Sequence, residues 1–287
     1  MRLFSYHVES GFAVGALAGA DTFVPLPFAS LLELIAWGEA GLATAREALA
    51  REPRAPLAGI QLVAPIPEPR RNIFCLGWNY SEHSKEAAAA RGRLEPPKLP
   101  TRPIFFTKAT TSVLAPEAAI PAHLGVTAQL DWEVELGVVI GKGGADIRQD
   151  QAMAHVFGYT VINDVSARDV QTSHGGQFFK GKSLDGTCPM GPWLVTADEV
   201  PDPHALRLTC KVNGAIKQDG RTSDMIFDIP STIEWLSKGM TLLPGDIIAT
   251  GTPAGVGFAR NPPEFLKTGD SVACEVEGLG VLQNTVR

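Results

Sequence analysis

Two segments of the sequence carry acidic residues at spacings that could bind a metal ion. In residues 131–136, Glu133 and Glu135 alternate with apolar residues, so a strand would place both carboxylates on one face, roughly 6.6 Å apart along the chain. Asp164 ends a second apolar segment, residues 156–164. Three carboxylates in one pocket would raise one another's pKa unless a cation neutralised them. We therefore expect Glu133, Glu135 and Asp164 to form a metal site; the alternative for 131–136 is a strand with one solvated face.

The chemistry of these side chains indicates which ion they would hold. An all-oxygen ligand set, without cysteine and with no required histidine, suits Mg²⁺ or Mn²⁺ better than Zn²⁺. Such an ion keeps coordination positions open for water or for a chelating 2-oxo carboxylate. We therefore expect Mg²⁺ or Mn²⁺ as the cofactor, at a site that a chelating 2-oxo carboxylate could occupy.

A lysine in a glycine-rich segment has two interpretations. Residues 176–183, GQFFKGKS, match the phosphate-loop pattern G-x-x-x-x-G-K-S. A phosphate loop must leave a buried strand and open a helix, but residues 166–174 are polar, and Gly186 and Pro189 lie where the helix should run. We expect instead that Lys182 stabilises a developing oxyanion or enolate beside the carboxylates. A surface lysine and a P-loop ATPase are the alternatives.

A histidine and a glutamate lie three residues apart in a predicted helix. Ser81 is a suitable N-cap, and the alanines at 87–90 favour a helix up to Gly92. His83 and Glu86 would share one face, where a carboxylate that orients the imidazole makes a general base for activating water. The alternative is an exposed helix with both side chains solvated. The Pro/Arg-rich residues 91–103 are expected to form a mobile loop, so the helix could act as a lid.

The pattern in the rest of the chain predicts the secondary structure around these residues. Residues 28–50 have helix-like apolar spacing broken near Gly38 and Gly41, and a Pro-rich stretch follows up to Pro69. We expect a small N-terminal domain over residues 1–69. From Ile73 onward, strand-length apolar runs are bounded by Gly and Pro, without regular strand–helix alternation. We expect a catalytic domain over residues 70–287 with an α+β, β-rich fold, a mixed β-sandwich or roll.

Composition excludes several classes of protein. The 287 residues carry a net charge of −6, without the clustered Lys/Arg excess of a nucleic-acid-binding surface. The N-terminus lacks the pattern of a secretion signal, and no run of about 18 apolar residues occurs, so we expect a cytoplasmic protein outside the membrane. The four cysteines are far apart and form no C-x-x-C pair, which favours buried free thiols over a zinc site or disulfides.

Six segments, taken in order, resemble the fumarylacetoacetate hydrolase family over about residues 70–287. They are LGWNYSEHSKE, DWEVELGVVIGK, NDVSARDVQ, FFKGKSLDGTCPMGPW, VNG followed by Gln218, and GDIIATGTPAGVG. The resemblance implies a mixed β-sandwich or roll, usually a homodimer, with the metal held by Glu133, Glu135 and Asp164. It also implies that Lys182 stabilises the enolate and that the His83–Glu86 dyad activates water, as in the shorter members of the family. Residues expected to hold the substrate are Arg168, Gln171, Gln218 and Thr252.

These expectations combine into one predicted activity with open alternatives. We predict a metal-dependent hydrolase that cleaves a C–C bond in a small 2,4-dioxo acid, such as an acylpyruvate or a fumarylpyruvate-like acid of aromatic catabolism, through a metal-stabilised enolate. Decarboxylation, hydration or tautomerisation of a related 2-oxo acid is the alternative within the family. A non-catalytic metal- or ligand-binding protein is the alternative from another class. No G-x-S-x-G segment occurs, which argues against a serine hydrolase.

Overall fold

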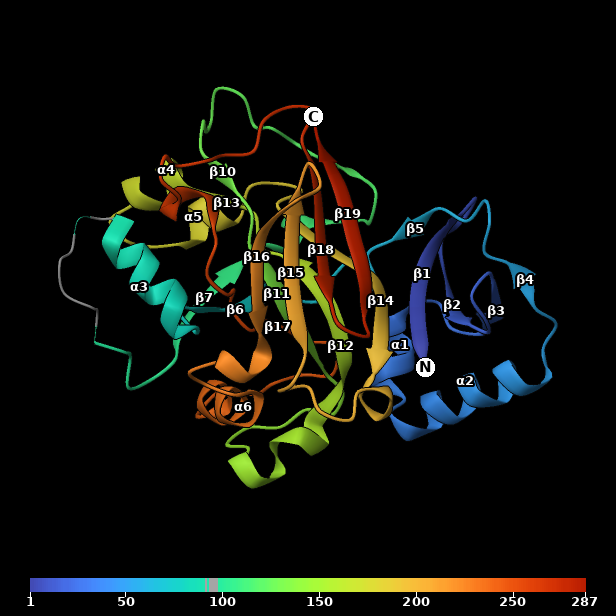
Figure 1. Ribbon diagram of the computed structural model, residues 1–287. Coiled ribbons are helices and arrows are strands. Elements are labelled where there is room, and N and C mark those ends of the chain that lie inside the picture. The colour runs from blue at the N-terminus through green and yellow to red at the C-terminus, as the bar shows by residue number, and fades with distance from the viewer. Residues whose placement is uncertain (91, 93–97) are drawn as a thin grey trace.

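A computed structural model describes residues 1–90, 92 and 98–287 of the chain, so the loop expected over 91–103 lies partly outside the described residues. In this part of the chain most strands join one mixed, twelve-stranded sheet (Figure 1). Along its main path the strands are β4 (Ala55–Pro56), β3 (Thr22–Leu26), β2 (Gly11–Leu17), β1 (Arg2–Val8), β14 (Cys188–Thr196), β12 (Val156–Asn163), β11 (Val134–Ile140), β17 (Ile247–Ala249), β6 (Ile73–Gly77) and β7 (Ile104–Lys108). Off this path, β5 (Leu62–Val63) pairs with β1, and β8 (Val113–Leu114) pairs with β14.

A second, five-stranded sheet packs against the first. Its strands, in order, are β16 (Ala215–Arg221), β15 (Arg207–Val212), β18 (Ser271–Val276), β19 (Gly280–Val286) and β9 (Ala119–Ile120). One apolar core joins the two sheets, because Leu136 and Val138 of β11 cluster with Leu208 of β15 and Val272 of β18. Two sheets packed face to face around a shared core form a sandwich. The expected α+β, β-rich fold is therefore confirmed.

The helices are short and lie at the edges of the sheets. They are α1 (Leu31–Ala36), α2 (Glu39–Arg51), α3 (Ser81–Ala90), α4 (Arg168–Ser173), α5 (Phe179–Lys182) and α6 (Ile229–Ser237), with 3₁₀ turns η1 (Thr110–Ser112), η2 (Gln149–His155), η3 (Ala197–Glu199), η4 (Thr222–Asp224) and η5 (Gly257–Ala259). The predicted helical segment 28–50 is interrupted at Gly38, where φ is 56°. Gly41 instead lies inside α2. Among the described residues, no helix is long and apolar enough to cross a membrane.

The first 69 residues continue the large sheet. β1 pairs antiparallel with β14, with Leu3 opposite Leu194, so β1 to β5 extend one edge of that sheet (Figure 1, blue). α1 packs under this edge, and its Leu34 and Ile35 share a core with Ile73 of β6. The N-terminal residues are thus joined to the rest by both a strand ladder and a core, and a separate small domain over 1–69 stays a prediction.

The pairing of β11 with β12 brings the acidic segments together. Val134, at the start of β11, lies opposite Asn163, at the end of β12, and the Asp164 amide donates to the Glu133 carbonyl (2.8 Å). This antiparallel register places the residue after β12 beside the residue before β11. All seven residues of β11 are buried. The alternative of a strand with one solvated face is therefore wrong.

Candidate active site

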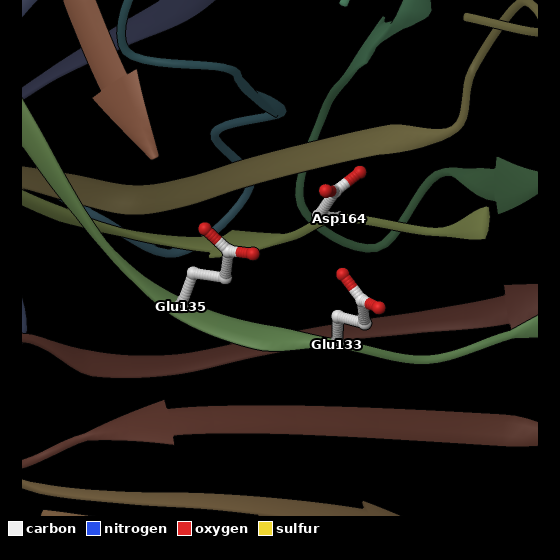
Figure 2. A group of neighbouring side chains, drawn as sticks. All are labelled: Glu133, Glu135 and Asp164. Atoms are coloured by element: carbon white, nitrogen blue, oxygen red, sulfur yellow. The ribbon is translucent and has the colours of Figure 1, made fainter. Parts of the chain in front are cut away.

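Three carboxylates converge at the β11–β12 junction. Glu133 lies between β10 (Leu130–Asp131) and β11, Glu135 lies in β11, and Asp164 lies between β12 and β13 (Ser166–Ala167). One oxygen from each side chain lies within 4.8 Å of the others (Figure 2). The exposed fractions of Glu133, Glu135 and Asp164 are 4%, 1% and 0%. The structure thus brings together the three residues that the sequence singled out as metal ligands.

The donor set fits a hard divalent cation. Glu135 accepts a hydrogen bond from the Gly251 amide (2.7 Å) and faces two further carboxylates. Burial, and then the charges of Asp164 and Glu133, raise the pKa of Glu135 well above its usual value. Three buried carboxylates with oxygens this close are the donor set that Mg²⁺ or Mn²⁺ prefers, so these residues could hold either ion.

Two buried lysines contact the same carboxylates. Lys182 Nζ lies 2.6 Å from Glu133 Oε2 and 2.7 Å from Asp164 Oδ2. Burial alone would lower the pKa of Lys182, but the charges of Asp164 and Glu133 outweigh it and raise that pKa. Lys108 Nζ lies 2.7 Å from Asp164 Oδ1 and donates to the Val165 carbonyl (3.2 Å). Lys182 is therefore held as a cation at the centre of the site, and Lys108 contacts the same aspartate from its other oxygen.

The position of Lys182 argues against a phosphate loop. Lys182 ends α5, a four-residue helix preceded by α4, and its side chain points at carboxylates. A phosphate loop would instead follow a buried strand and leave its lysine for an anionic ligand.

Lys108 was not predicted as a site residue. The clue in the sequence was a lysine at the end of the apolar run IFFTK. Such a position is buried in the structure, and a fully buried lysine is rare unless it is paired.

Arg168 connects the carboxylates to a neighbouring network. Its Nη2 donates to Glu133 Oε1 (2.6 Å), its Nε to Asp131 Oδ2 (2.8 Å) and its Nη1 to Gln171 Oε1 (3.2 Å). The Phe258 ring covers the guanidinium at 4.4 Å. Arg168 and Gln171, both predicted to hold substrate oxygens, line the same pocket as Glu133. Asp131 was not predicted, although an aspartate directly before WEVE was visible in the sequence.

The predicted dyad lies on α3, facing the carboxylates. His83 Nδ1 lies 2.8 Å from Glu86 Oε1, and Glu86 Oε2 accepts a hydrogen bond from the Gly255 amide (2.8 Å). His83 is only 6% exposed and lines the pocket, so the alternative of an exposed helix with a solvated histidine is wrong. With Nδ1 on Glu86, the opposite nitrogen Nε2 is left for substrate or water.

Gln218 and Thr252 lie on one side of the site and support the start of β11. Gln218 Oε1 accepts from the Val134 amide (3.0 Å), while its Nε2 donates to Thr252 Oγ1 (2.7 Å) and to the Pro253 carbonyl (2.8 Å). Thr252 Oγ1 donates to the Val134 carbonyl (2.8 Å). Thr252 also lines the pocket, whereas the Gln218 amide is engaged by the backbone around it. Because the Thr252 hydroxyl also donates to the backbone, both side chains support the start of β11 in this structure, and substrate contact by either one stays a prediction.

A strained turn before α3 completes the pocket. Trp78 has a positive φ of 54°, and such a conformation in a non-glycine residue costs on the order of 1 kcal/mol. Buried Asn79 holds the turn, because its Nδ2 donates to the Thr250 carbonyl (2.8 Å) and its Oδ1 accepts from the Phe227 amide (2.8 Å). The pocket is lined by Leu76, Gly77, Trp78, His83, Phe106, Glu133, Glu135, Arg168, Gln171, Phe178, Lys182, Thr252 and Phe258.

Comparisons with known proteins agree with this architecture. The chain is 46% identical over 267 residues to the oxaloacetate tautomerase YisK of Bacillus subtilis (strain 168), covering 90% of this chain and 86% of that protein. It is 42% identical over 282 residues to the mitochondrial oxaloacetate tautomerase Fahd2a of Rattus norvegicus, covering 97% and 86%. The solved structure of the fumarylacetoacetate hydrolase EaFAH from psychrophilic Exiguobacterium antarcticum superposes with a TM-score of 0.85 at 40% identity, covering 100% of this chain and 99% of that one.

The family is defined by a match over most of the chain. The family model described as fumarylacetoacetate (FAA) hydrolase C-terminal matches residues 72–287, which contain every residue of the site described above. The resemblance expected from the six sequence segments is therefore confirmed. The chain belongs to the fumarylacetoacetate hydrolase family and shares the enzyme fold of its tautomerase and hydrolase relatives.

Proposed function

We propose that this protein is a Mg²⁺- or Mn²⁺-dependent enzyme that interconverts the keto and enol forms of a small 2-oxo acid, with oxaloacetate as the first candidate. The observation that carries the proposal is the buried Glu133–Glu135–Asp164 group with Lys182 beside it. The names of the Bacillus subtilis and rat relatives, both oxaloacetate tautomerases, support this choice of substrate. The proposal includes the homodimer expected from the resemblance, which static light scattering would measure.

The residues of the pocket have separate parts in this reaction. A bound divalent ion supplies a Lewis acid that lowers the free energy of an enolate. Arg168 and Gln171 orient the substrate through its carboxylate oxygens. His83, held through Nδ1 by Glu86, accepts a proton from C3 at Nε2 and returns a proton to the C2 oxygen. The Lys182 ammonium stabilises the negative charge that develops on that oxygen, which favours the transition state over the ground state.

Hydrolysis of a 2,4-dioxo acid is the second candidate. The observation that favours it is the buried His83–Glu86 pair, because a held imidazole can take a proton from an attacking water. Water would add to the C4 carbonyl, the C3–C4 bond would break, and C3 would receive a proton. The products are a carboxylic acid and pyruvate, so the released pyruvate distinguishes this reaction from tautomerisation.

A product-resolved assay tests both candidates. Oxaloacetate and a series of acylpyruvates are incubated with the enzyme and Mg²⁺, Mn²⁺ or a chelator, while enol absorbance and pyruvate are followed together. We expect metal-dependent relaxation of the oxaloacetate enol without pyruvate above the spontaneous rate. Asp219→Asn, which changes an exposed carboxylate paired with Arg207, serves as the matched control and should behave as wild type. Metal-dependent pyruvate release from acylpyruvates would favour hydrolysis, pyruvate from oxaloacetate would indicate decarboxylation, and no turnover of any substrate would refute the enzymatic proposal.

A further inference from the structure

One short segment, residues 255–258, contacts both sides of the candidate active site. At one end the Gly255 amide donates to Glu86 Oε2 (2.8 Å), the carboxylate that also holds His83. At the other end the Phe258 ring covers the Arg168 guanidinium at 4.4 Å. The segment therefore lies between the helix that carries the dyad and the arginine that faces the carboxylates.

Asp131 fastens this segment to Arg168. Its Oδ1 accepts from the Gly257 amide (2.6 Å), and its Oδ2 accepts from the Phe258 amide (3.0 Å) and from Arg168 Nε (2.8 Å). The side chain is fully buried, with 0% of its surface exposed. A Cβ added at Gly257 would lie 2.6 Å from Asp131 Oδ1, so only glycine allows this close approach. One charged group thus holds two backbone amides and a guanidinium in a fixed arrangement.

The residue next to Asp131 strengthens the same attachment. The Trp132 indole Nε1 donates to the Gly255 carbonyl (3.2 Å), and the Trp132 amide donates to Asp131 Oδ1 (2.9 Å). Glu86 on α3, the segment 255–258 and Arg168 are therefore linked through consecutive hydrogen bonds that pass through residues 131 and 132. None of these contacts requires a bound ligand.

We propose, on the basis of the proposed function, that Asp131 is a positioning residue that couples the placement of α3 and its dyad to the orientation of Arg168. The Asp131 carboxylate accepts from the segment 255–258 and from Arg168 at once, so neither can move freely without losing a charge-assisted bond, and the Gly255 amide passes this restraint on to Glu86 of α3. Asparagine keeps the shape but replaces one acceptor oxygen with an NH₂ group, which would face other donors. Asp131→Asn therefore weakens both connections while leaving Glu133, Glu135 and Asp164 unchanged.

Two measurements independent of turnover test this proposal. Amide hydrogen exchange is measured for peptides of α3 (residues 81–90), and oxalate binding to the Mn²⁺-loaded protein is measured by calorimetry, because oxalate has the adjacent oxygens of a 2-oxo acid. For Asp131→Asn we expect exchange in α3 to rise about tenfold, as for one lost charge-assisted bond, and oxalate affinity to fall roughly 10- to 100-fold. Asp219→Asn, which changes an exposed carboxylate–arginine pair, should stay within about twofold of wild type in both measurements.

The outcomes separate this inference from the proposed function. A folded Asp131→Asn protein with wild-type exchange in α3 and wild-type oxalate affinity would overturn the coupling, even if the wild-type enzyme tautomerises oxaloacetate. If Asp131→Asn does not fold, Glu86→Ala breaks the same connection at its other end, and we expect faster exchange at residues 255–258. Unchanged exchange there would also overturn the coupling. Absence of turnover in the wild type would count against the proposed function alone.

Discussion

Replacement of Lys182 by methionine should have opposite effects on metal affinity and on turnover. Lys182 Nζ bonds to Glu133 and Asp164, which are two of the three proposed metal ligands. The ammonium group and a divalent ion therefore compete for the same carboxylates. Methionine has a similar length but no charge, so Lys182→Met removes the competitor while keeping most of the packing.

The magnitude follows from the burial of these groups. Removing one partner of a buried ion pair costs about 3–5 kcal/mol, because the remaining charge stays in a poor solvent. For a chain of this size that corresponds to a fall in Tm of roughly 10 °C without metal. In the variant, Mn²⁺ no longer displaces an ammonium group, so we expect its affinity to rise about tenfold, or ~1.4 kcal/mol. Turnover should fall about 10²- to 10³-fold, the usual loss for a group that stabilises an oxyanion.

Thermal melts with chelator give the Tm without metal, and melts with increasing Mn²⁺ give the Mn²⁺ affinity. Steady-state kinetics measure turnover. Lys180→Met is the matched control, because Lys180 lies in the same segment but is exposed. We expect the control to keep wild-type Tm, Mn²⁺ affinity and turnover. A Lys182→Met variant that melted at the wild-type temperature in chelator, or that bound Mn²⁺ more weakly than wild type, would contradict competition between Lys182 and the metal.

Three further predictions concern individual side chains. Asp164→Ala should abolish metal-dependent turnover and the rise in Tm on adding Mn²⁺, and full activity without added metal would contradict the site. His83→Ala should slow tautomerisation or hydrolysis about 10²- to 10⁴-fold in product assays. Any oxaloacetate decarboxylation should slow less, because loss of CO₂ needs neither removal of a proton from C3 nor an attacking water; equal loss of all three activities would remove this distinction. All four cysteine thiols are free and buried, and burial raises the pKa of Cys188 to about 12. A thiol reagent should therefore label the native protein only as fast as local or global unfolding exposes the cysteines. Rapid stoichiometric labelling would show instead that the thiols are accessible in the folded protein.

Local spacing in the sequence is enough to identify two pairs of candidate site residues. Glu133 and Glu135 are two residues apart, so strand periodicity places them on one face. His83 and Glu86 are three residues apart, so helix periodicity places them on one face. Both spacings are only two or three residues, so local backbone geometry alone determines how these side chains lie relative to each other. The alternation of apolar runs with Gly and Pro likewise determined that the fold is β-rich, because strand length and turn chemistry are local properties.

Which distant groups meet depends on the three-dimensional fold. Asp164 joins the glutamates because the β11–β12 register places Val134 opposite Asn163, and the partner of Lys108 lies 56 positions away along the chain. Asp131 likewise has partners on two distant segments, the Arg168 guanidinium and the Gly257 and Phe258 amides. Pairing between distant strands depends on loop closure and on the shared core, and neither leaves a period in the sequence. For the same reason the sequence pattern changes near residue 69, but it does not show that β1, before this point, pairs with β14, after it, in one sheet.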